Sequence, residues 1–404
     1  MVPLGFKVAR GLHCCSAWIS GGLMEQRQLV RWRRAAGLTQ EQLAELLNVS
    51  LSTVRRWERG HDKPRPWRYP PLARVLKIKV ADVSALFDGP PATVEPSQAP
   101  SAPTIADLTT VLELREAHLA LSARYELVPS SELLAEGSEQ LAHLKQLAKQ
   151  SHSGRLTRDM LALQAETAIL MGKIVWDASQ RRASAAARAY YDQAARIGER
   201  LRDPAVQGHA LLRSAYVELY GTRDAEAGLV LARSAATVAA PISPALAGLA
   251  LLHAGEAHAM LRQGRECDRA LGEAISTLET VDATDIASDL GAVDQVERLA
   301  GSCHLELGQH RAAQRRLEAA ASSVSIGPKS RPIVLGNLAR AAIGQGQLDG
   351  AVFAIGRAID DLQTVMSGGG IGVVVTAVRE LRPWRTAQEV QDVQDRLFDL
   401  MAAP

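Results

Sequence analysis

Cysteine is scarce in this sequence, with four residues among 404. Apart from the adjacent Cys14 and Cys15, their spacing is typical neither of a metal site nor of a disulfide framework. We therefore expect a reducing compartment, the cytoplasm. No apolar run approaches the roughly 20 residues that a membrane-spanning helix needs, so we expect no membrane partner.

Sequence patterns of catalysis and metal binding are also missing. The chain has no HExxH pattern, no nucleophile elbow and no Cys/His metal set. The Gly-rich segment 367–372 lacks the Lys and the Ser or Thr of a phosphate-binding loop, and no strand precedes it, so we expect a flexible connection between the last helices. The sequence predicts no enzyme, no catalytic or metal-binding residue and no cofactor.

Charge is unevenly distributed along the chain. The whole sequence carries 46 Lys and Arg against 44 Asp and Glu, a formal net charge of +2. Residues 1–88 hold 15 of the basic and 7 of the acidic residues, which leaves 31 basic and 37 acidic residues for 89–404. Residues 1–88 therefore form a basic head, and the rest of the chain is acidic. This charge predicts a polyanionic partner for the head.

Residues 39–60, TQEQLAELLNVSLSTVRRWERG, have the pattern of two short helices joined by a tight turn. Thr39 can cap the first helix, and Gln42 three positions later completes a capping box. We expect this helix to run from Gln40 to Leu47, with Asn48 at a turn position that requires a left-handed backbone. Its predicted apolar face consists of Leu43, Ala44, Leu46 and Leu47.

The second helix is predicted to begin after a Ser50 cap, to run from Leu51 to Arg59 and to stop at Gly60. Val54 and Trp57 lie three positions apart and should face the core. The opposite side carries Ser52, Arg55 and Arg56, and its long side chains can reach guanine acceptors in the major groove. This pattern predicts double-stranded DNA as the partner, whereas the alternative for the arginines is an ordinary solvated helix face.

Residues 27–88 resemble the Cro/C1-type helix-turn-helix domains of the XRE family. The resemblance implies a small lambda-repressor-like DNA-binding domain of five short helices, with Leu51, Ser52, Arg55 and Arg56 at the base-facing positions. It also implies a phosphate contact by Gln40, at the N-terminus of the first motif helix, where backbone N–H groups favour anions. Further candidate phosphate contacts among the flanking basic residues are Arg31, Arg33, Arg34, Lys63, Arg65 and Arg68.

Four segments are predicted. Residues 1–23 have a short, broken apolar run without a cleavage site, so we expect a disordered extension. The helix-turn-helix domain should occupy residues 24–88. Residues 89–104 hold five prolines among Ser, Ala and Thr, which predicts an extended linker. Residues 105–404 should form a separate body.

This body reads as all-α, because helical periodicity runs through it and strand-like alternation is almost absent. Small residues recur in a common frame at Ala187, Ala227, Ala270, Ala313 and Ala351, with spacings of 40, 43, 43 and 38 residues. The frame resembles tetratricopeptide repeats with lengthened helices, which implies an α-solenoid of helical hairpins. An irregular helical bundle is the alternative.

A solenoid offers a concave surface for a peptide, a protein segment or a second copy of the chain. The combination of head and body resembles the peptide-responsive regulators of Gram-positive bacteria, in which a row of Asn side chains clamps the peptide backbone. This chain has two asparagines, Asn48 and Asn337, so the clamp does not carry over directly. A peptide, small-molecule or protein effector and a role in dimerisation all stay open.

Four tyrosines cluster in the central repeats. Lining a pocket and packing in the core both stay open as their role. They are Tyr190, Tyr191, Tyr216 and Tyr220.

We therefore expect a cytoplasmic bacterial transcriptional regulator that binds specific DNA sequences as a homodimer, with the helical body serving dimerisation and effector or partner binding. One alternative is a tetratricopeptide protein-interaction adaptor in which the DNA-binding head is accessory. A second is an antitoxin-like autorepressor, against which the long body counts.

Overall fold

The structure is a computed structural model that describes two parts of the chain. In the N-terminal part it describes residues 29–34, 36–47, 49–59, 61–64, 68–76, 78, 83 and 87, and in the body 108–150, 154–323 and 326–402. The chain separates into two compact units, Met1–Pro103 and Thr104–Pro404. Predictions for residues 1–23 and 89–104, and for Asn48, Gly60 and Arg65, lie outside the described residues.

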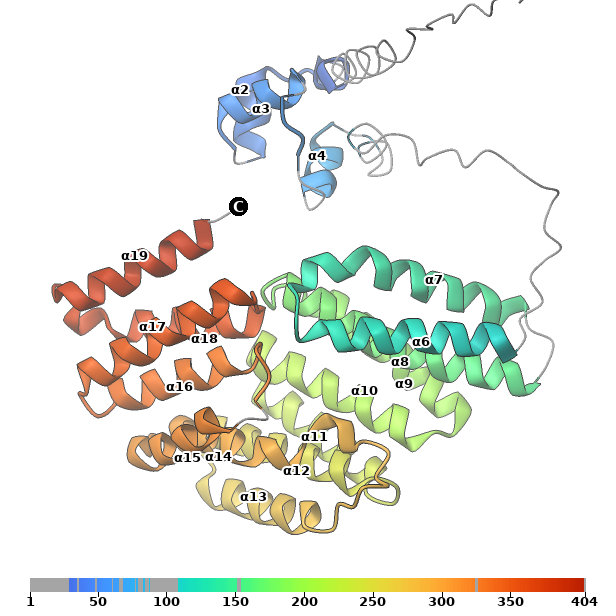
Figure 1. The fold of residues 1–404 in the computed structure, drawn as a ribbon, viewed down its shortest axis with the longest axis vertical. Helices are drawn as coiled ribbons and strands as arrows, with labels where there is room; N and C mark the ends of the chain where they lie inside the picture. The colour runs from blue at the N-terminus through green and yellow to red at the C-terminus, as the bar shows by residue number, and fades with distance from the viewer. Residues whose placement is uncertain are drawn as a thin grey trace, which may run out of the picture. The chain divides into compact units, whose positions relative to one another are not determined.

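The N-terminal unit consists of short helices around one small core (Figure 1). Residues 29–34 are helical, and α2 (Gln40–Leu46), α3 (Leu51–Glu58) and α4 (Tyr69–Leu76) follow. The ring of Tyr69 stacks on Phe87, with 5.9 Å between the ring centroids. The buried core comprises Leu29, Leu43, Ala44, Leu47, Val54, Trp57, Tyr69, Leu72, Ala73, Leu76 and Val83.

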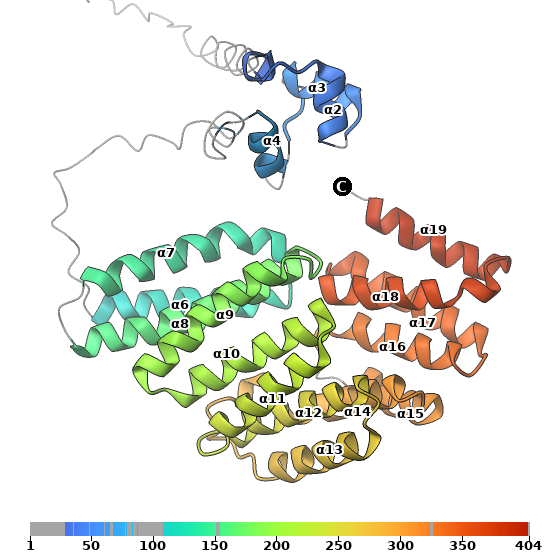
Figure 2. The same cartoon turned by 180° about the vertical axis from the view of Figure 1, so that it is seen from behind.

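The body is all-α, as predicted, and its described residues contain no strand. Successive helices pack as hairpins that stack in chain order, so the body is an α-solenoid (Figures 1 and 2). Its α-helices are α6 (Leu108–Tyr125), α7 (Leu134–Gln150), α8 (Gly154–Ala178), α9 (Ser184–Leu201), α10 (Pro204–Val217), α11 (Ala225–Ala239), α12 (Pro244–Met260), α13 (Gly264–Leu278), α14 (Val296–Glu306), α15 (His310–Ser322), α16 (Arg331–Ile343), α17 (Leu348–Thr364), α18 (Gly368–Glu380) and α19 (Gln388–Ala402).

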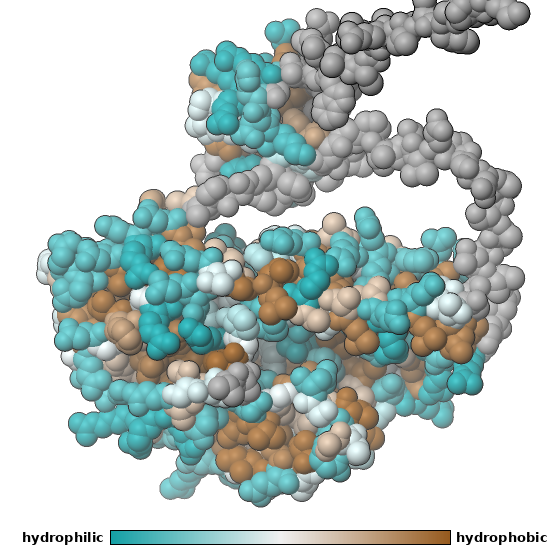
Figure 3. Space-filling model, viewed as in Figure 1, coloured by the Kyte–Doolittle hydropathy of each residue, from teal (hydrophilic) through white to brown (hydrophobic). Residues whose placement is uncertain are grey.

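Shorter helical turns join some of these helices. Four are 3-10 turns: η2 (Ser130–Leu133), η4 (Ser288–Leu290), η5 (Val293–Gln295) and η6 (Arg382–Trp384). The fifth, η3 (Glu218–Thr222), is a π-helical turn that extends α10. Hydrophilic side chains cover much of the body, with hydrophobic ones showing between them (Figure 3). None of the described helices combines the length and the apolar composition that crossing a bilayer requires.

The turns inside the hairpins reverse the chain through a left-handed backbone. Gly308 and Gly346 take this conformation at the turns after α14 and α16, with φ of +75° and +73°. The turns after α10 and α12 place Arg223 and Arg262 there instead, although a side chain makes the conformation costly by about 1–2 kcal/mol. Packing of the flanking helices therefore imposes the turn where no glycine is present.

The predicted frame of small residues is correct in three of the five hairpins. Ala187, Ala313 and Ala351 are each the fourth residue of the second helix of a hairpin, and each is fully buried. In α11 the equivalent residue is Gly228, and Ala227 beside it is only half-buried. In α13 it is Cys267, one turn before Ala270. A Cβ on Gly228 would come within 2.5 Å of the Leu219 side chain, so helix contact selects glycine there.

The prediction of a flexible connection at residues 367–372 is wrong, because these residues begin α18. Ser367 caps the helix and accepts a hydrogen bond from Gly370 N at 3.0 Å. A Cβ on Gly368 would clash with the backbone oxygen of Asp177, and one on Gly369 would clash with Arg181. Glycines are therefore needed for a close approach of α18 to the end of α8.

Asp177 in α8 connects the early helices of the solenoid to the late ones. Its Oδ1 accepts a hydrogen bond from Gly368 N at 2.7 Å, although the two residues are 191 positions apart. Its Oδ2 accepts from Ser130 Oγ at 2.7 Å and lies 3.1 Å from Lys329 Nζ in a largely buried ion pair. These contacts join η2, α8, the segment before α16 and the start of α18.

Candidate nucleic-acid interface

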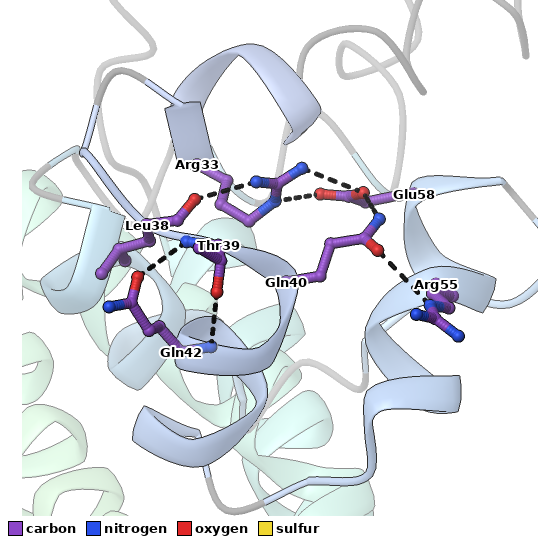
Figure 4. Close-up of polar contacts among 7 residues, drawn as sticks. All are labelled: Arg33, Leu38, Thr39, Gln40, Gln42, Arg55 and Glu58. Carbon is purple, nitrogen blue, oxygen red and sulfur yellow. Dashed lines mark hydrogen bonds and ion pairs between the residues drawn. The ribbon is translucent and has the colours of Figure 1, made fainter.

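Local side-chain contacts fix the start of both motif helices as predicted. Gln42 N donates to Thr39 Oγ1 at 3.2 Å and Thr39 N donates to Gln42 Oε1 at 2.9 Å, which confirms the capping box (Figure 4). Ser50 caps α3 by accepting a hydrogen bond from Thr53 N at 3.2 Å. Each cap satisfies a backbone donor that the first helical turn leaves unpaired.

The C-terminal ends are each one residue shorter than predicted, with Leu47 and Arg59 as the C-caps of α2 and α3. The prediction that Leu46 faces the core is also wrong, since it is 59% exposed while Leu43 and Leu47 are buried. One residue of helix is a rotation of about 100°, which takes Leu46 away from the buried side defined by Leu47 and Ala44. The helix-turn-helix thus has an apolar residue on its surface.

Helix α3 has the predicted two sides. Val54 is fully buried and Trp57 is 4% exposed, so these side chains anchor the helix to the core. Ser52, Arg55 and Arg56 are exposed on the other side, and Leu51 is half-buried at the N-terminus. The side chains that are predicted to contact DNA bases therefore lie together on one exposed surface of α3, and the buried side of the helix packs on the core.

A buried ion pair lies behind this surface. Arg33 Nε is 2.5 Å from Glu58 Oε1, and the two side chains are only 9% and 5% exposed. Arg33 also donates from Nη1 to the Leu38 carbonyl oxygen at 2.8 Å (Figure 4). The prediction of a phosphate contact by Arg33 is therefore wrong, because its guanidinium is occupied inside the domain.

Gln40 connects this ion pair to the exposed surface. Its Nε2 donates to Glu58 Oε2, and its Oε1 accepts from Arg55 Nε at 3.4 Å (Figure 4). The side-chain amide of Gln40, at the N-terminus of α2, thus contacts both the buried Glu58 and the exposed Arg55. Gln40 and Arg55, both proposed as DNA contacts from the sequence, are brought together by the fold.

The remaining flanking basic residues differ in their surroundings. Arg31, Arg34 and Lys63 are exposed. Arg68 donates from Nη1 to the Leu47 carbonyl oxygen at 2.9 Å, so part of its guanidinium holds the end of α2. The exposed residues are suitably placed on the surface for contact with a polyanion.

Acidic residues accompany both exposed arginines of α3. Arg55 lies 3.8 Å from Glu41 and Arg56 lies 3.3 Å from Asp62, and all four side chains are about half exposed. The pKa of the Glu41 carboxyl is lowered, first by a backbone hydrogen bond and then by the Thr39 hydroxyl. Exposed ion pairs contribute only about 0–1 kcal/mol, so DNA can replace these carboxylates at little cost.

Three acids that contact candidate DNA-binding residues or the buried Arg33 were not identified from the sequence: Glu41, Glu58 and Asp62. Glu58 had a usable signal, because it lies four positions after buried Val54 and hence on the same side of α3. Its partner Arg33 is 25 positions away, and the sequence around Arg33 gave no signal of this contact.

Comparison with known families matches residues 29–83 to the helix-turn-helix model HTH_3. The chain therefore carries a helix-turn-helix DNA-binding domain of the XRE kind. Comparison with curated proteins gives no match. Among solved structures, the crystal structure of BtubC (BKLC) from P. vanneervenii covers 57% of this chain and 90% of its own, with 16% identity and a TM-score of 0.41.

Proposed function

We propose that this chain is a sequence-specific transcriptional regulator whose α3 enters the major groove of DNA. The observation that carries the proposal is the exposed surface of α3, where Ser52, Arg55 and Arg56 project from a helix anchored by Val54 and Trp57. Arginine can make two parallel hydrogen bonds to guanine O6 and N7, which is the commonest specific contact in this groove. Leu51 would contact a thymine methyl group.

Phosphate contacts would complete the interface. Gln40 and Lys63 are proposed as such contacts, as is Arg65 in the segment between Pro64 and Arg68, and exposed Arg31 and Arg34 extend the positive surface. Contacts of this kind position the domain without reading sequence and make binding weaken steeply with salt.

The regulator is proposed to act as a homodimer. One small DNA-binding module buries only about 600–1,000 Å², which gives modest specificity by itself. Two heads on half-sites about one helical turn apart would supply the rest. The body, which we propose to be built of tetratricopeptide-like hairpins, would join the two chains and bind an effector or a partner protein. Such a protein would work where the chromosome lies, in a bacterial cytoplasm.

Selection of binding sites from a random duplex pool by the full chain tests the proposal. The expected product is an inverted repeat, bound by two chains when the complex is examined by sedimentation. Recovery of sequences without a common pattern, bound only at low salt, would overturn it and favour the adaptor. A defined site occupied by one chain would refute the homodimer and leave sequence-specific binding intact.

A further inference from the structure

The body contains a partly open cavity of about 720 Å³. Its walls come from α6, α8, α9, α10, η3, α12 and α14, together with the segment before α14 and the starts of α16 and α18. Pockets for small organic molecules occupy roughly 300–1,000 Å³, so this cavity has room for one. Tyr191, Tyr216 and Tyr220 line it, which is the pocket role left open for the central tyrosines.

The charged lining of the cavity is unbalanced. It contains six Lys and Arg side chains against four carboxylates. Two pairs neutralise each other: Arg115 lies 3.3 Å from Glu166, and Lys329 lies 3.1 Å from Asp177. The other carboxylates are Glu126 and Asp289. The other cations, twice as many, are Lys173, Arg181, Arg213 and Arg298.

These four cations have no carboxylate within 4.0 Å in the part of the chain that the structure describes. Lys173 Nζ is 4.2 Å from the centre of the Tyr125 ring. The Arg181 guanidinium lies 4.8 Å from the Trp176 ring, and that of Arg213 lies 5.1 Å from the Tyr216 ring. Aromatic faces stabilise a cation by roughly 0.5–2 kcal/mol, less than a desolvated anion can provide.

The cations also repel one another. The pKa of Lys173 is lowered to about 7, first by burial and then by the charge of Arg213. The pKa of His209 is lowered well below its usual value by burial and then by Arg213 and Lys173. Positive charge from α8 and α10 is therefore concentrated in one partly desolvated space, and an anion placed there would relieve the repulsion.

An apolar wall completes the lining. Apolar side chains on the wall formed by α12 and the loop before α14 are Leu246, Leu249, Ile286, Ala287 and Leu290. The cavity thus combines a cationic part and an apolar part.

We propose that this cavity binds a small organic anion, whose carboxylate or phosphate group lies among Lys173, Arg213 and Arg298 and whose apolar part contacts Leu246 and Leu290. The site is separate from the DNA-binding domain. Its role as the effector site of a regulator rests on the proposed function, but binding of the anion does not, and the test below involves no DNA.

The fluorescent sulfonate 8-anilinonaphthalene-1-sulfonate is a suitable probe, because it joins an anionic group to an aromatic body. The full chain is titrated with this probe, and the bound probe is displaced with 1-naphthyl phosphate, 1-naphthoate and neutral 1-naphthol. We expect one probe per chain and at least tenfold stronger competition by the anions than by 1-naphthol. The ranking of phosphate against carboxylate identifies the preferred anionic group.

Variants connect binding to the cavity. Arg213→Gln and Arg298→Gln each remove one cation, and we expect each to weaken probe binding about tenfold. Exposed Arg196→Gln in α9 removes the same charge outside the cavity and should leave binding unchanged. Circular dichroism establishes that each variant is folded. Arg213→Gln also loses a hydrogen bond to His209, so Arg298→Gln provides the test if Arg213→Gln does not fold.

Three results would overturn the proposal. These are absence of saturable binding to the folded chain, equal competition by 1-naphthol and the anions, and unchanged binding by both cavity variants. Each leaves the DNA-binding proposal untouched, because no step of the measurement depends on it.

Discussion

Arg33 and Glu58 form a buried ion pair that joins the helix at residues 29–34 to α3, with 2.5 Å between Arg33 Nε and Glu58 Oε1. Gln40 donates to the same carboxylate and accepts from Arg55, so the pair supports the exposed surface of α3. The orientation of the exposed surface of α3 thus depends on an ion pair between two buried residues.

Breaking this pair should destabilise the N-terminal unit. Glu58→Ala leaves Arg33 buried without its partner, and such losses cost about 3–5 kcal/mol. Amide hydrogen exchange in α2 and α3, followed by mass spectrometry of the full chain, should accelerate strongly while exchange in the body stays unchanged. The double variant Arg33→Met/Glu58→Leu should recover much of the protection, and identical exchange in Glu58→Ala and the wild type would contradict this account.

Gln40 offers a second prediction, because a positioning role and a phosphate contact have different consequences. If Gln40 holds Arg55 in place, the effects of Gln40→Ala and Arg55→Ala on DNA affinity should not add, with a coupling of about 0.5 kcal/mol or more. A double-mutant cycle on one selected duplex measures this coupling. Additive losses would mean that Gln40 contacts phosphate independently of Arg55.

Two helix glycines of the body should respond oppositely to alanine. A Cβ on Gly172 of α8 would lie 2.7 Å from Cζ of the fully buried Tyr191 ring, so Gly172→Ala should destabilise by roughly 1–3 kcal/mol. Gly272 of α13 is exposed with nothing within 4 Å, and Gly272→Ala should stabilise by about 0.5–1 kcal/mol. Urea unfolding of both variants checks the pair, and equal shifts would contradict the packing at Tyr191.

His118 predicts a pH dependence of stability. Its pKa is lowered from 6.5 to about 4, first by burial and then by Arg115 and Lys173, while its ring faces Glu166 and Thr167. Between pH 6.5 and 4 the unfolded chain binds a proton at this residue that the folded chain does not. The free energy of unfolding should therefore fall as the pH falls through this window, by about 3 kcal/mol for this group at most.

The variant His118→Asn isolates this contribution, because nearby Glu166 also has a shifted pKa, raised by its burial. Urea unfolding at pH 7, 6, 5 and 4.5 should give a shallower decline for His118→Asn than for the wild type. Parallel declines in the two proteins would show that His118 is solvated and titrates normally.

Features that depend on near neighbours in sequence could be predicted, and features that depend on distant contacts could not. The Thr39 and Ser50 caps and the two sides of α3 follow from residues within one or two turns. Burial of Arg33 depends on Glu58, which lies 25 positions away, so the basic flank alone suggested a surface role. Gly368 and Gly369 were predicted to be flexible, because the residues they approach, Asp177 and Arg181, are nearly 200 positions away in the sequence.

The body shows the same limit. Ala187, Ala313 and Ala351 revealed the hairpins from their spacing, but Gly228 and Cys267 occupy the equivalent place in α11 and α13 and broke the frame. The clustered tyrosines suggested a pocket as one of their roles. The cations of the cavity could not be predicted, because Lys173, Arg213 and Arg298 come from three helices that meet only when the body is folded.

The most direct test of the account is the affinity of the Arg56→Ala variant for a selected duplex and for its single base-pair variants, with exposed Arg74→Ala of α4 as the matched charge control. The account predicts that Arg56→Ala loses about 1–3 kcal/mol on the selected site and becomes indifferent to the base pair at one position of each half-site. Arg74→Ala should retain full base discrimination. A loss that is the same for every sequence, or no loss at all, would contradict base reading by the exposed surface of α3.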